Sequence, residues 1–94
     1  MSDLVRRRVS VSGRVQGVGF RYFVRSTAGR VGVSGFVRNM PDGTVQAEVQ
    51  GNPEGVDRFL DAIREGPPGA RVDQVDVNEV PAEKEKEGFE IRFS

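Results

Sequence analysis

The spacing of apolar residues in this sequence changes repeatedly between a period of two and a helical period, which limits the chain to few folds. Residues 5–11 largely alternate between apolar and polar side chains, which predicts a half-buried strand that ends at Gly13. The apolar residues that follow recur at i, i+3, i+4 and i+7, and they predict a helix over residues 21–31. Alternation returns in residues 34–40 and 45–49, on either side of a Pro-Asp-Gly turn.

The second half of the chain shows the same order of elements. Asn52 can cap a helix that begins at Pro53, and a Gly-Pro-Pro-Gly segment ends that helix after residue 65. Residues 71–80 predict a strand in which Val72 and Val80 fall out of phase with Val75 and Val77, so we expect a kink or a bulge in it. A last short strand is predicted in residues 89–93, where apolar residues alternate with charged residues.

The order β-α-β-β-α-β with one extra strand predicts an α+β fold of the ferredoxin-like, split-βαβ type. We expect a mainly antiparallel sheet of about five strands with two helices on one face. Residues 1–94 are expected to form a single domain, since a chain carries roughly 100–200 residues per domain. Because this fold hosts RNA binders, metal carriers, regulatory modules and enzymes, it does not by itself indicate a function.

The chain contains no Cys and no His, which excludes much chemistry. A disulfide framework, a Cys nucleophile, a Cys or His metal site and imidazole acid–base catalysis are all ruled out, and we expect neither metal nor cofactor. The 14 basic and 14 acidic residues cancel, unlike the basic excess of a nucleic-acid-binding protein. Without an apolar run of about 18 residues or a signal peptide, we expect a cytoplasmic protein with no membrane partner.

Two charged runs have simple interpretations. Alternation divides Arg6, Arg7 and Arg8 between the two faces of the first strand, so we expect a solvated strand end rather than a nucleic-acid surface. Residues 83–87 are all charged and are expected to form a solvated loop.

The glycine-rich join before the first helix is the most informative segment. Gly13, Gly17 and Gly19 lie within seven residues, and glycine permits positive φ and close approach of a ligand to the backbone. Successive amides in such a loop can form an anion-binding nest, to which the helix N-terminus adds a partial positive charge. Arg21, in the first helical turn, could bind a phosphate bidentately. Neither common phosphate-loop motif matches, and the spacing alone leaves open a plain turn beside a solvated arginine.

Asn39 is a second candidate. In the ferredoxin-like topology the strand at residues 34–40 runs parallel to the first strand, so Asn39 should lie at the same edge of the sheet as the glycine loop. Its carboxamide offers both a donor and an acceptor and does not ionise, which suits it to orienting a water molecule. On its own, Asn39 also fits a turn residue before Pro41.

Two segments resemble the signatures of the acylphosphatase family. Residues 11–21 match V-x-G-x-V-Q-G-V-x-(F/M)-R at every specified position, and residues 35–51 match G-(F/Y/W)-(A/V/C)-(K/R)-N-x3-G-x-V-x5-G. The resemblance covers essentially the whole chain, to residues 89–91. Similar units also occur inside larger carbamoyl-transfer proteins, but we expect a 94-residue chain that starts with Met to be free-standing.

The resemblance implies an activity and a set of site residues. Acylphosphatases hydrolyse the carboxyl–phosphate bond of acyl phosphates to a carboxylate and inorganic phosphate, without a metal or a phospho-enzyme. By correspondence, Arg21 would bind the phosphate and Asn39 would position the attacking water. The phosphoryl oxygens would be held by the backbone amides of Val15, Gln16, Gly17, Val18, Gly19 and Phe20. We expect a monomer, with the acyl phosphate as substrate and inorganic phosphate as product and inhibitor.

This chemistry agrees with the residues available. Phosphoryl transfer depends mainly on positioning and charge stabilisation, and a carboxylate leaving group needs no general acid. The strands lack the aromatic run of an RNA-recognition domain. A non-catalytic phosphate-sensing module stays open, since binding an anion requires the loop but not Asn39. No residue plainly recognises the acyl group, which predicts broad tolerance of that group.

Overall fold

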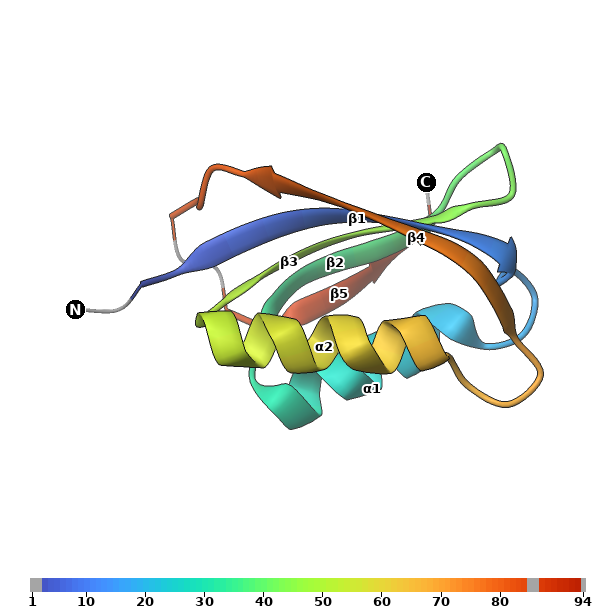
Figure 1. Cartoon of the computed structure of the whole chain (residues 1–94), viewed down its shortest axis with the longest axis horizontal. Coiled ribbons are helices and arrows are strands. Elements are labelled where there is room, and N and C mark those ends of the chain that lie inside the picture. Colours follow the sequence, from blue (N-terminus) through green and yellow to red (C-terminus); the bar gives the residue numbers. More distant parts are fainter. Residues whose placement is uncertain (1–2, 85–86, 94) are drawn as a thin grey trace.

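The computed structural model describes residues 3–84 and 87–93 of the 94-residue chain. Within these residues the elements follow one another as β1 (Val5–Arg14), α1 (Phe20–Val31), β2 (Ser34–Asn39), β3 (Val45–Gly51), α2 (Pro53–Glu65), β4 (Arg71–Val80) and β5 (Phe89–Arg92) (Figure 1). This order is the one that the apolar spacing predicts. Neither described helix is long and apolar enough to cross a membrane.

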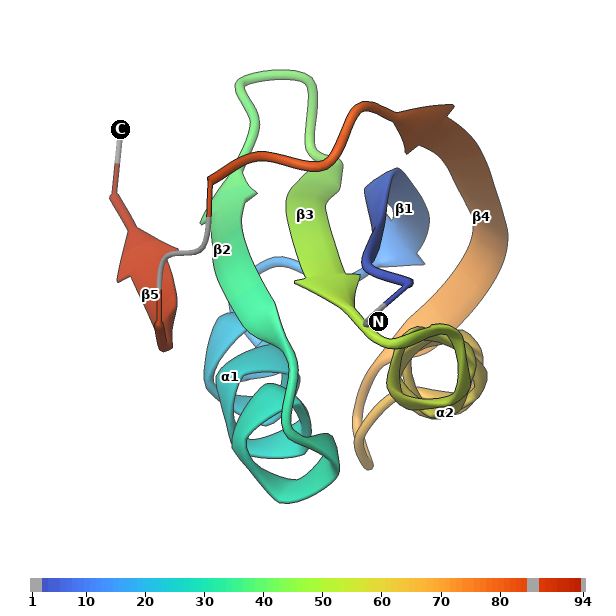
Figure 2. The same ribbon diagram turned by 90° about the vertical axis from the view of Figure 1, so that its left-hand side faces the viewer.

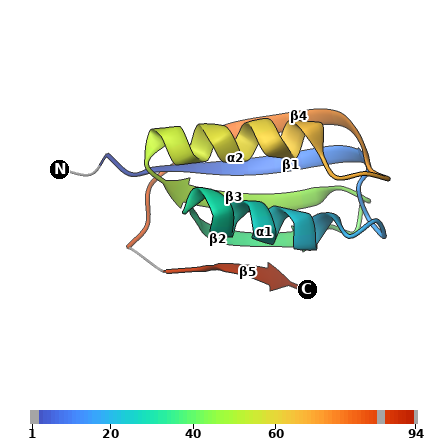
Figure 3. The same cartoon turned by 90° about the horizontal axis from the view of Figure 1, so that it is seen from below.

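The strands form one sheet in the order β4-β1-β3-β2-β5, and both helices cover the same face of it (Figures 2 and 3). β1 pairs antiparallel with β3 and β4, β2 pairs antiparallel with β3, and β5 joins β2 in parallel. The predicted α+β, ferredoxin-like fold is therefore confirmed, and the extra strand extends the sheet at the β2 edge. Because β1 and β2 are both antiparallel to β3, they run in the same direction and end at the same edge of the sheet.

The helix boundaries follow from local chemistry. α1 begins at Phe20, one residue before the predicted start, because Gly19 takes a left-handed conformation at the N-cap position. α2 begins at Pro53 as predicted, and the Asn52 side chain accepts a 2.8 Å hydrogen bond from the backbone N–H of Gly55. Such a cap typically stabilises a helix by about 1 kcal/mol.

One hydrophobic core lies between the helices and the covered face of the sheet. It is made by alternate residues of the three central strands and by one stripe of each helix, including Val9, Val11, Val37, Val45, Val49, Phe20, Val24, Val56, Phe59 and Ile63. Each fully buried side chain of this size contributes roughly 1.5–3 kcal/mol. A slip of one residue in any of these strands would expose its apolar set, so the core fixes the register at the sheet edge where β1 and β2 end.

The expected irregularity in β4 is present. Ser12 of β1 pairs with Gln74, whereas the next residue, Gly13, pairs with Val72, so one residue of β4 is left over. This bulge lets Val72 and Val75 both pack against the core although their spacing breaks strict alternation.

The basic run of β1 is divided between the faces as predicted, but it is solvated only in part, since Arg8 is exposed and Arg6 is buried. On the face without helices, Arg6 is only 8% exposed, and its Nε donates to Glu48 Oε1 over 2.8 Å. Arg8 Nε donates to the other Glu48 oxygen over 3.1 Å, while Arg7 pairs with Glu79. Burial is the largest single influence and raises the Glu48 pKa, but the hydrogen bonds and charges of Arg6 and Arg8 together lower it below its ordinary value.

The charged segment at residues 83–87 is partly anchored. Glu83 is exposed, but its backbone N–H donates to Gln50 Oε1 over 2.8 Å and its carbonyl accepts from Gln50 Nε2 over 3.0 Å. The prediction of a solvated loop is therefore incomplete at Glu83, while Glu85 and Lys86 lie outside the described residues.

Candidate active site

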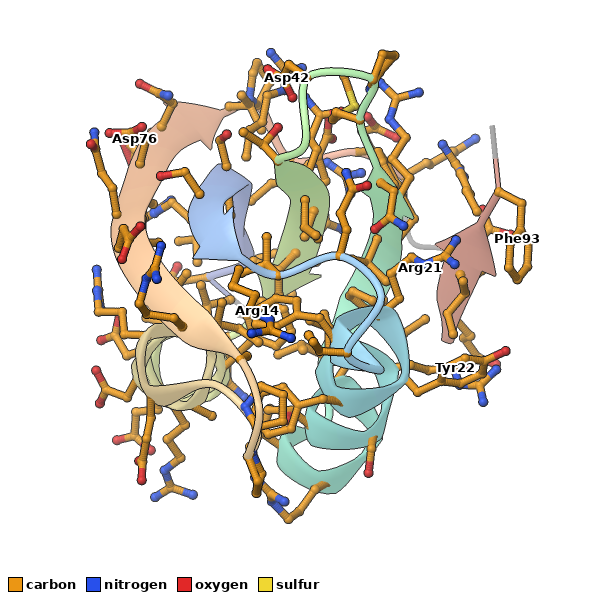
Figure 4. All side chains as sticks on the ribbon, turned by 90° about the vertical axis from the view of Figure 1, so that its right-hand side faces the viewer. Arg14, Arg21, Tyr22, Asp42, Asp76 and Phe93 are labelled. Atoms are coloured by element: carbon orange, nitrogen blue, oxygen red, sulfur yellow. The ribbon has the colours of Figure 1, made fainter. Side chains whose placement is uncertain are left out.

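A small pocket lies at the sheet edge where β1 and β2 end. Its volume is about 90 Å³, and its wall is made by Val15, Gly17, Gly19, Phe20, Arg21, Tyr22 and Asn39. Figure 4 looks onto this end of the molecule and shows the glycine loop crossing from β1 to α1. The structure thus brings Arg21 and Asn39 together with the glycine loop, as the shared direction of β1 and β2 predicts.

The backbone of the loop takes a left-handed conformation at two of its glycines. Gly17 and Gly19 both have φ of 74°, and a Cβ at either position would meet nothing within 4 Å. The requirement for glycine there is therefore conformational rather than steric, because side-chain residues rarely adopt this φ. Gly19 leads directly into α1, whose first turn carries no acidic residue. The first N–H groups of a helix lack intrahelical partners and carry a partial positive charge, which favours an anion at this end of α1.

The loop is anchored at both ends by buried side chains. Val15 is 1% exposed and Phe20 is 2% exposed, and both belong to the core. Gly17 and Gly19, between them, are exposed. The core thus holds the ends of the loop, while its glycine backbone is left at the surface.

Arg21 is held by the end of β5. Its Nη1 donates a 3.2 Å hydrogen bond to the carbonyl oxygen of Arg92, and its guanidinium carbon lies 4.6 Å from the centre of the Phe93 ring. Figure 4 shows the side chain directed toward Phe93. Neither contact neutralises the guanidinium, so both orient the positive charge without cancelling it.

Gln16 and Val18 are the two loop residues that do not form the pocket wall. Val18 is half-buried and packs against the core. The Gln16 side chain turns toward the β2–β3 hairpin, where its Nε2 donates to the carbonyl oxygens of Met40 and Thr44, each over 2.9 Å. Both partners are acceptors only, so the amide nitrogen must face them.

Sequence reasoning missed three residues around the pocket. Tyr22 forms part of the wall and is 55% exposed, and its only sequence signal is its position beside Arg21 in the first helical turn. Arg92 and Phe93 contact Arg21 across 71 and 72 residues of chain, and no local pattern announces that contact. The parallel pairing of β5 with β2 brings them there, and the apolar pattern does not reveal this pairing.

The size of the pocket limits what it can enclose. Pockets for drug-sized ligands measure roughly 300–1,000 Å³, so a pocket of about 90 Å³ suits a small anion and leaves any attached group outside. A larger hollow of about 430 Å³ opens on the other face of the sheet, but its Arg6 and Gln50 side chains already bond to protein groups. Across residues 3–84 and 87–93, no three potential metal-binding side chains gather at one point.

The fold and the pocket define a small ferredoxin-like protein with a glycine-lined pocket at its first strand–helix junction. The family model described as Acylphosphatase matches residues 7–91. A protein named Acylphosphatase from Rubrobacter xylanophilus is 54% identical over 87 residues, covering 93% of this chain and 79% of that protein. Another protein named Acylphosphatase, from Anaeromyxobacter dehalogenans, is 50% identical over 93 residues, covering 99% of this chain and 100% of that protein.

A solved structure gives the same result. The crystal structure of acylphosphatase from Bacillus subtilis is similar with a TM-score of 0.90 and 35% sequence identity, covering 94% of this chain and 98% of that one. The chain therefore belongs to the acylphosphatase family, and it is an enzyme with acylphosphatase function.

Proposed function

We propose that this enzyme hydrolyses the carboxyl–phosphate bond of small acyl phosphates by direct, in-line attack of water. The observation that supports this mechanism is that the glycine loop, Arg21 and Asn39 form the wall of one small pocket. The three together supply the requirements of phosphoryl transfer, which are an anion cradle, a compensating charge and a group that orients the nucleophile.

The phosphoryl group is bound by the loop and Arg21. The backbone amides of residues 15–20 donate to its oxygens, and the Arg21 guanidinium donates from the first turn of α1. Donors that are already fixed in place stabilise charge on these oxygens without reorganising during the reaction. Val15 and Phe20 anchor the loop in the core, and the Arg92 carbonyl and Phe93 ring orient Arg21, so both donor sets are held before substrate arrives.

Asn39 positions the water. Its carboxamide oxygen accepts a hydrogen bond from the water and holds the water oxygen behind phosphorus, opposite the leaving group. The water oxygen forms a bond to phosphorus while the bond from phosphorus to the acyl oxygen breaks. The acyl group leaves as a carboxylate, whose conjugate acid has a pKa of about 4, so it needs no proton at neutral pH. The water proton passes to a phosphate oxygen, which leaves inorganic phosphate and the unchanged enzyme.

Several consequences belong to the same proposal. The reaction uses neither a metal nor a covalent phospho-enzyme, and inorganic phosphate competes with substrate for the loop. A monomer of one domain, working in the cytoplasm, provides the whole site. Because the pocket is small, the acyl group remains largely outside it, and the enzyme accepts acyl phosphates with different acyl groups.

The test is the ultraviolet-monitored hydrolysis of benzoyl phosphate in EDTA by the wild type, Asn39→Ala and Arg21→Ala. We expect rapid wild-type turnover and a fall in kcat of about 10²–10⁴ in Asn39→Ala, the range for loss of a positioning or charge-stabilising group. Asn39→Ala should retain phosphate inhibition, and Arg21→Ala should lose both inhibition and activity. Near-wild-type turnover in Asn39→Ala would remove Asn39 from the mechanism. Phosphate binding without turnover in the wild type would indicate a sensor.

A further inference from the structure

The Gln16 side chain joins the two parts of the pocket. Its backbone lies in the glycine loop, between Val15 and Gly17, which both form the pocket wall. Its Nε2 donates to the carbonyl oxygens of Met40 and Thr44 in the β2–β3 hairpin, each over 2.9 Å. One carboxamide therefore connects the segment that holds the phosphate with the segment that carries Asn39.

The two carbonyl groups that Gln16 contacts flank Asn39 closely. Asn39 is paired with Val45 across the β2–β3 ladder. Met40 follows Asn39 directly, and Thr44 directly precedes Val45. Gln16 thus bonds to the hairpin one residue beyond the Asn39 pair on both strands, and any movement of this pair relative to the loop must stretch these bonds.

The hairpin itself is held together by its own hydrogen bonds. Met40 N–H donates to the Thr44 carbonyl over 2.8 Å, and Gly43 N–H donates to the Met40 carbonyl over 3.1 Å. The Asp42 carboxylate accepts from the Thr44 hydroxyl over 2.7 Å and from its N–H over 3.0 Å, and these bonds lower the Asp42 pKa. The two bonds from Gln16 join this hairpin directly to the glycine loop.

We propose that the Gln16 side chain is a positioning residue, which sets the distance between the phosphate-binding loop and Asn39. This role rests on the hydrolytic function proposed above. Glutamine is suited to it because its amide nitrogen carries two N–H donors, one for each carbonyl. A misplacement of about 1 Å in a reacting group lowers a rate about 10²-fold, so a tether between nucleophile and electrophile acts on kcat.

The expected effect is confined to the chemical step. Gln16→Met removes both donors while keeping the length of the side chain, and it leaves the backbone amide of the loop in place. In the proposed mechanism the loop that contains Gln16 and the side chain of Arg21 hold the phosphate. Asn39 belongs to the hairpin to which the Gln16 side chain bonds. We expect kcat to fall about 10- to 100-fold, while the inhibition constant of inorganic phosphate changes by no more than about twofold.

Gln50→Met is the matched control. Gln50 also donates through Nε2 to a distant backbone carbonyl, that of Glu83 over 3.0 Å, but on the open face of the sheet. The Gln50→Met variant loses a similar side-chain-to-backbone hydrogen bond at a residue that is not part of the pocket wall, so we expect its kcat to equal that of the wild type. An equal loss of kcat in both variants would show a general effect of lost hydrogen bonding and overturn the proposal.

A double-mutant cycle separates this role from the function itself. If Gln16 acts through Asn39, Gln16→Met should lower kcat no further in the Asn39→Ala background. Additive losses, or a phosphate inhibition constant that rises as much as kcat falls, would overturn the positioning role. Failure of Asn39→Ala alone to lose turnover would instead count against the proposed mechanism, and the two failures are thus distinguished.

Gln16→Glu provides a second variant with a pH readout. An ionised carboxylate faces two carbonyl oxygens without a donor, whereas its protonated form regains one O–H. The ratio of the wild-type kcat to the Gln16→Glu kcat should therefore become smaller as the pH is lowered toward the ordinary glutamate pKa of about 4.3, because the carboxylate becomes protonated. A loss that stays constant with pH would contradict the tether, including in the case where Gln16→Met does not fold.

Discussion

The Arg21 guanidinium, from the first turn of α1, donates a hydrogen bond to the carbonyl oxygen of Arg92, 71 residues further along the chain. The ring of Phe93, the next residue, lies 4.6 Å from the guanidinium carbon. The guanidinium of this pocket-lining residue is therefore oriented by the end of β5, the strand that the basic ferredoxin-like plan does not include.

Phe93→Ala should weaken phosphate binding. The substitution removes the ring beneath Arg21, an interaction of about 0.5–1 kcal/mol at an exposed site, which corresponds to roughly two- to fivefold in affinity. The measurement is the inhibition constant of inorganic phosphate, with Leu4→Ala as a control that also trims an exposed apolar side chain. An unchanged inhibition constant in Phe93→Ala would show that the Arg92 carbonyl alone suffices.

Gly19→Ala and Gly29→Ala should change stability in opposite directions. A Cβ at either position meets nothing within 4 Å, but Gly19 has φ of 74° whereas Gly29 lies inside α1. The left-handed conformation costs an alanine about 1–2 kcal/mol, while alanine is favoured over glycine in a helix by about 0.8–1.0 kcal/mol. Thermal unfolding measures both, at roughly 4–8 °C per kcal/mol. Stabilisation by Gly19→Ala would contradict the loop conformation.

Protonation of Glu48 in acid should lower the stability of the protein. Arg6 and Arg8 hold the pKa of Glu48 below its ordinary value of 4.5, so the folded state binds a proton less readily than the unfolded chain. Its contribution is therefore fully present above pH 4.5 and is lost as pH falls through the lowered folded-state pKa. Glu48→Gln should be less stable at neutral pH, and its difference from wild type in urea denaturation should narrow below pH 4.5. A difference independent of pH would exclude this linkage.

Tyr22 should influence the acyl group rather than the phosphate. It forms part of the pocket wall and is 55% exposed, so its ring is available to the part of a substrate that stays outside. Tyr22→Ala should lower kcat/KM for benzoyl phosphate by about two- to tenfold, the value of an aromatic contact of 0.5–1.5 kcal/mol. Acetyl phosphate, which has no ring, serves as the matched substrate and should be little affected. Equal losses for both substrates would place Tyr22 in phosphate binding.

Local patterns were sufficient for most of the fold because each element carries its own periodicity and end signals. Asn52 and Pro53 mark the start of α2, and the alternation of β1 identifies its buried face. Strand direction then placed Asn39 beside the loop. The contacts of Gln16 and Arg21 were not predictable in this way, because each joins residues distant in sequence through backbone carbonyls, which any residue type provides. Arg6 was expected at a solvated strand end because its partner Glu48 lies on another strand.

The placement of β5 also links activity to local opening of the structure. β5 has four residues and pairs only with β2 in the described sheet, whereas β1, β2 and β3 each have neighbours on both sides. Short edge elements open with less free energy than the whole domain. Detachment of β5 would release Arg21 while the loop, Asn39 and the core remain folded. In rising denaturant, hydrolysis should therefore decline before the global unfolding transition, which makes turnover a sensitive reporter of this edge of the sheet.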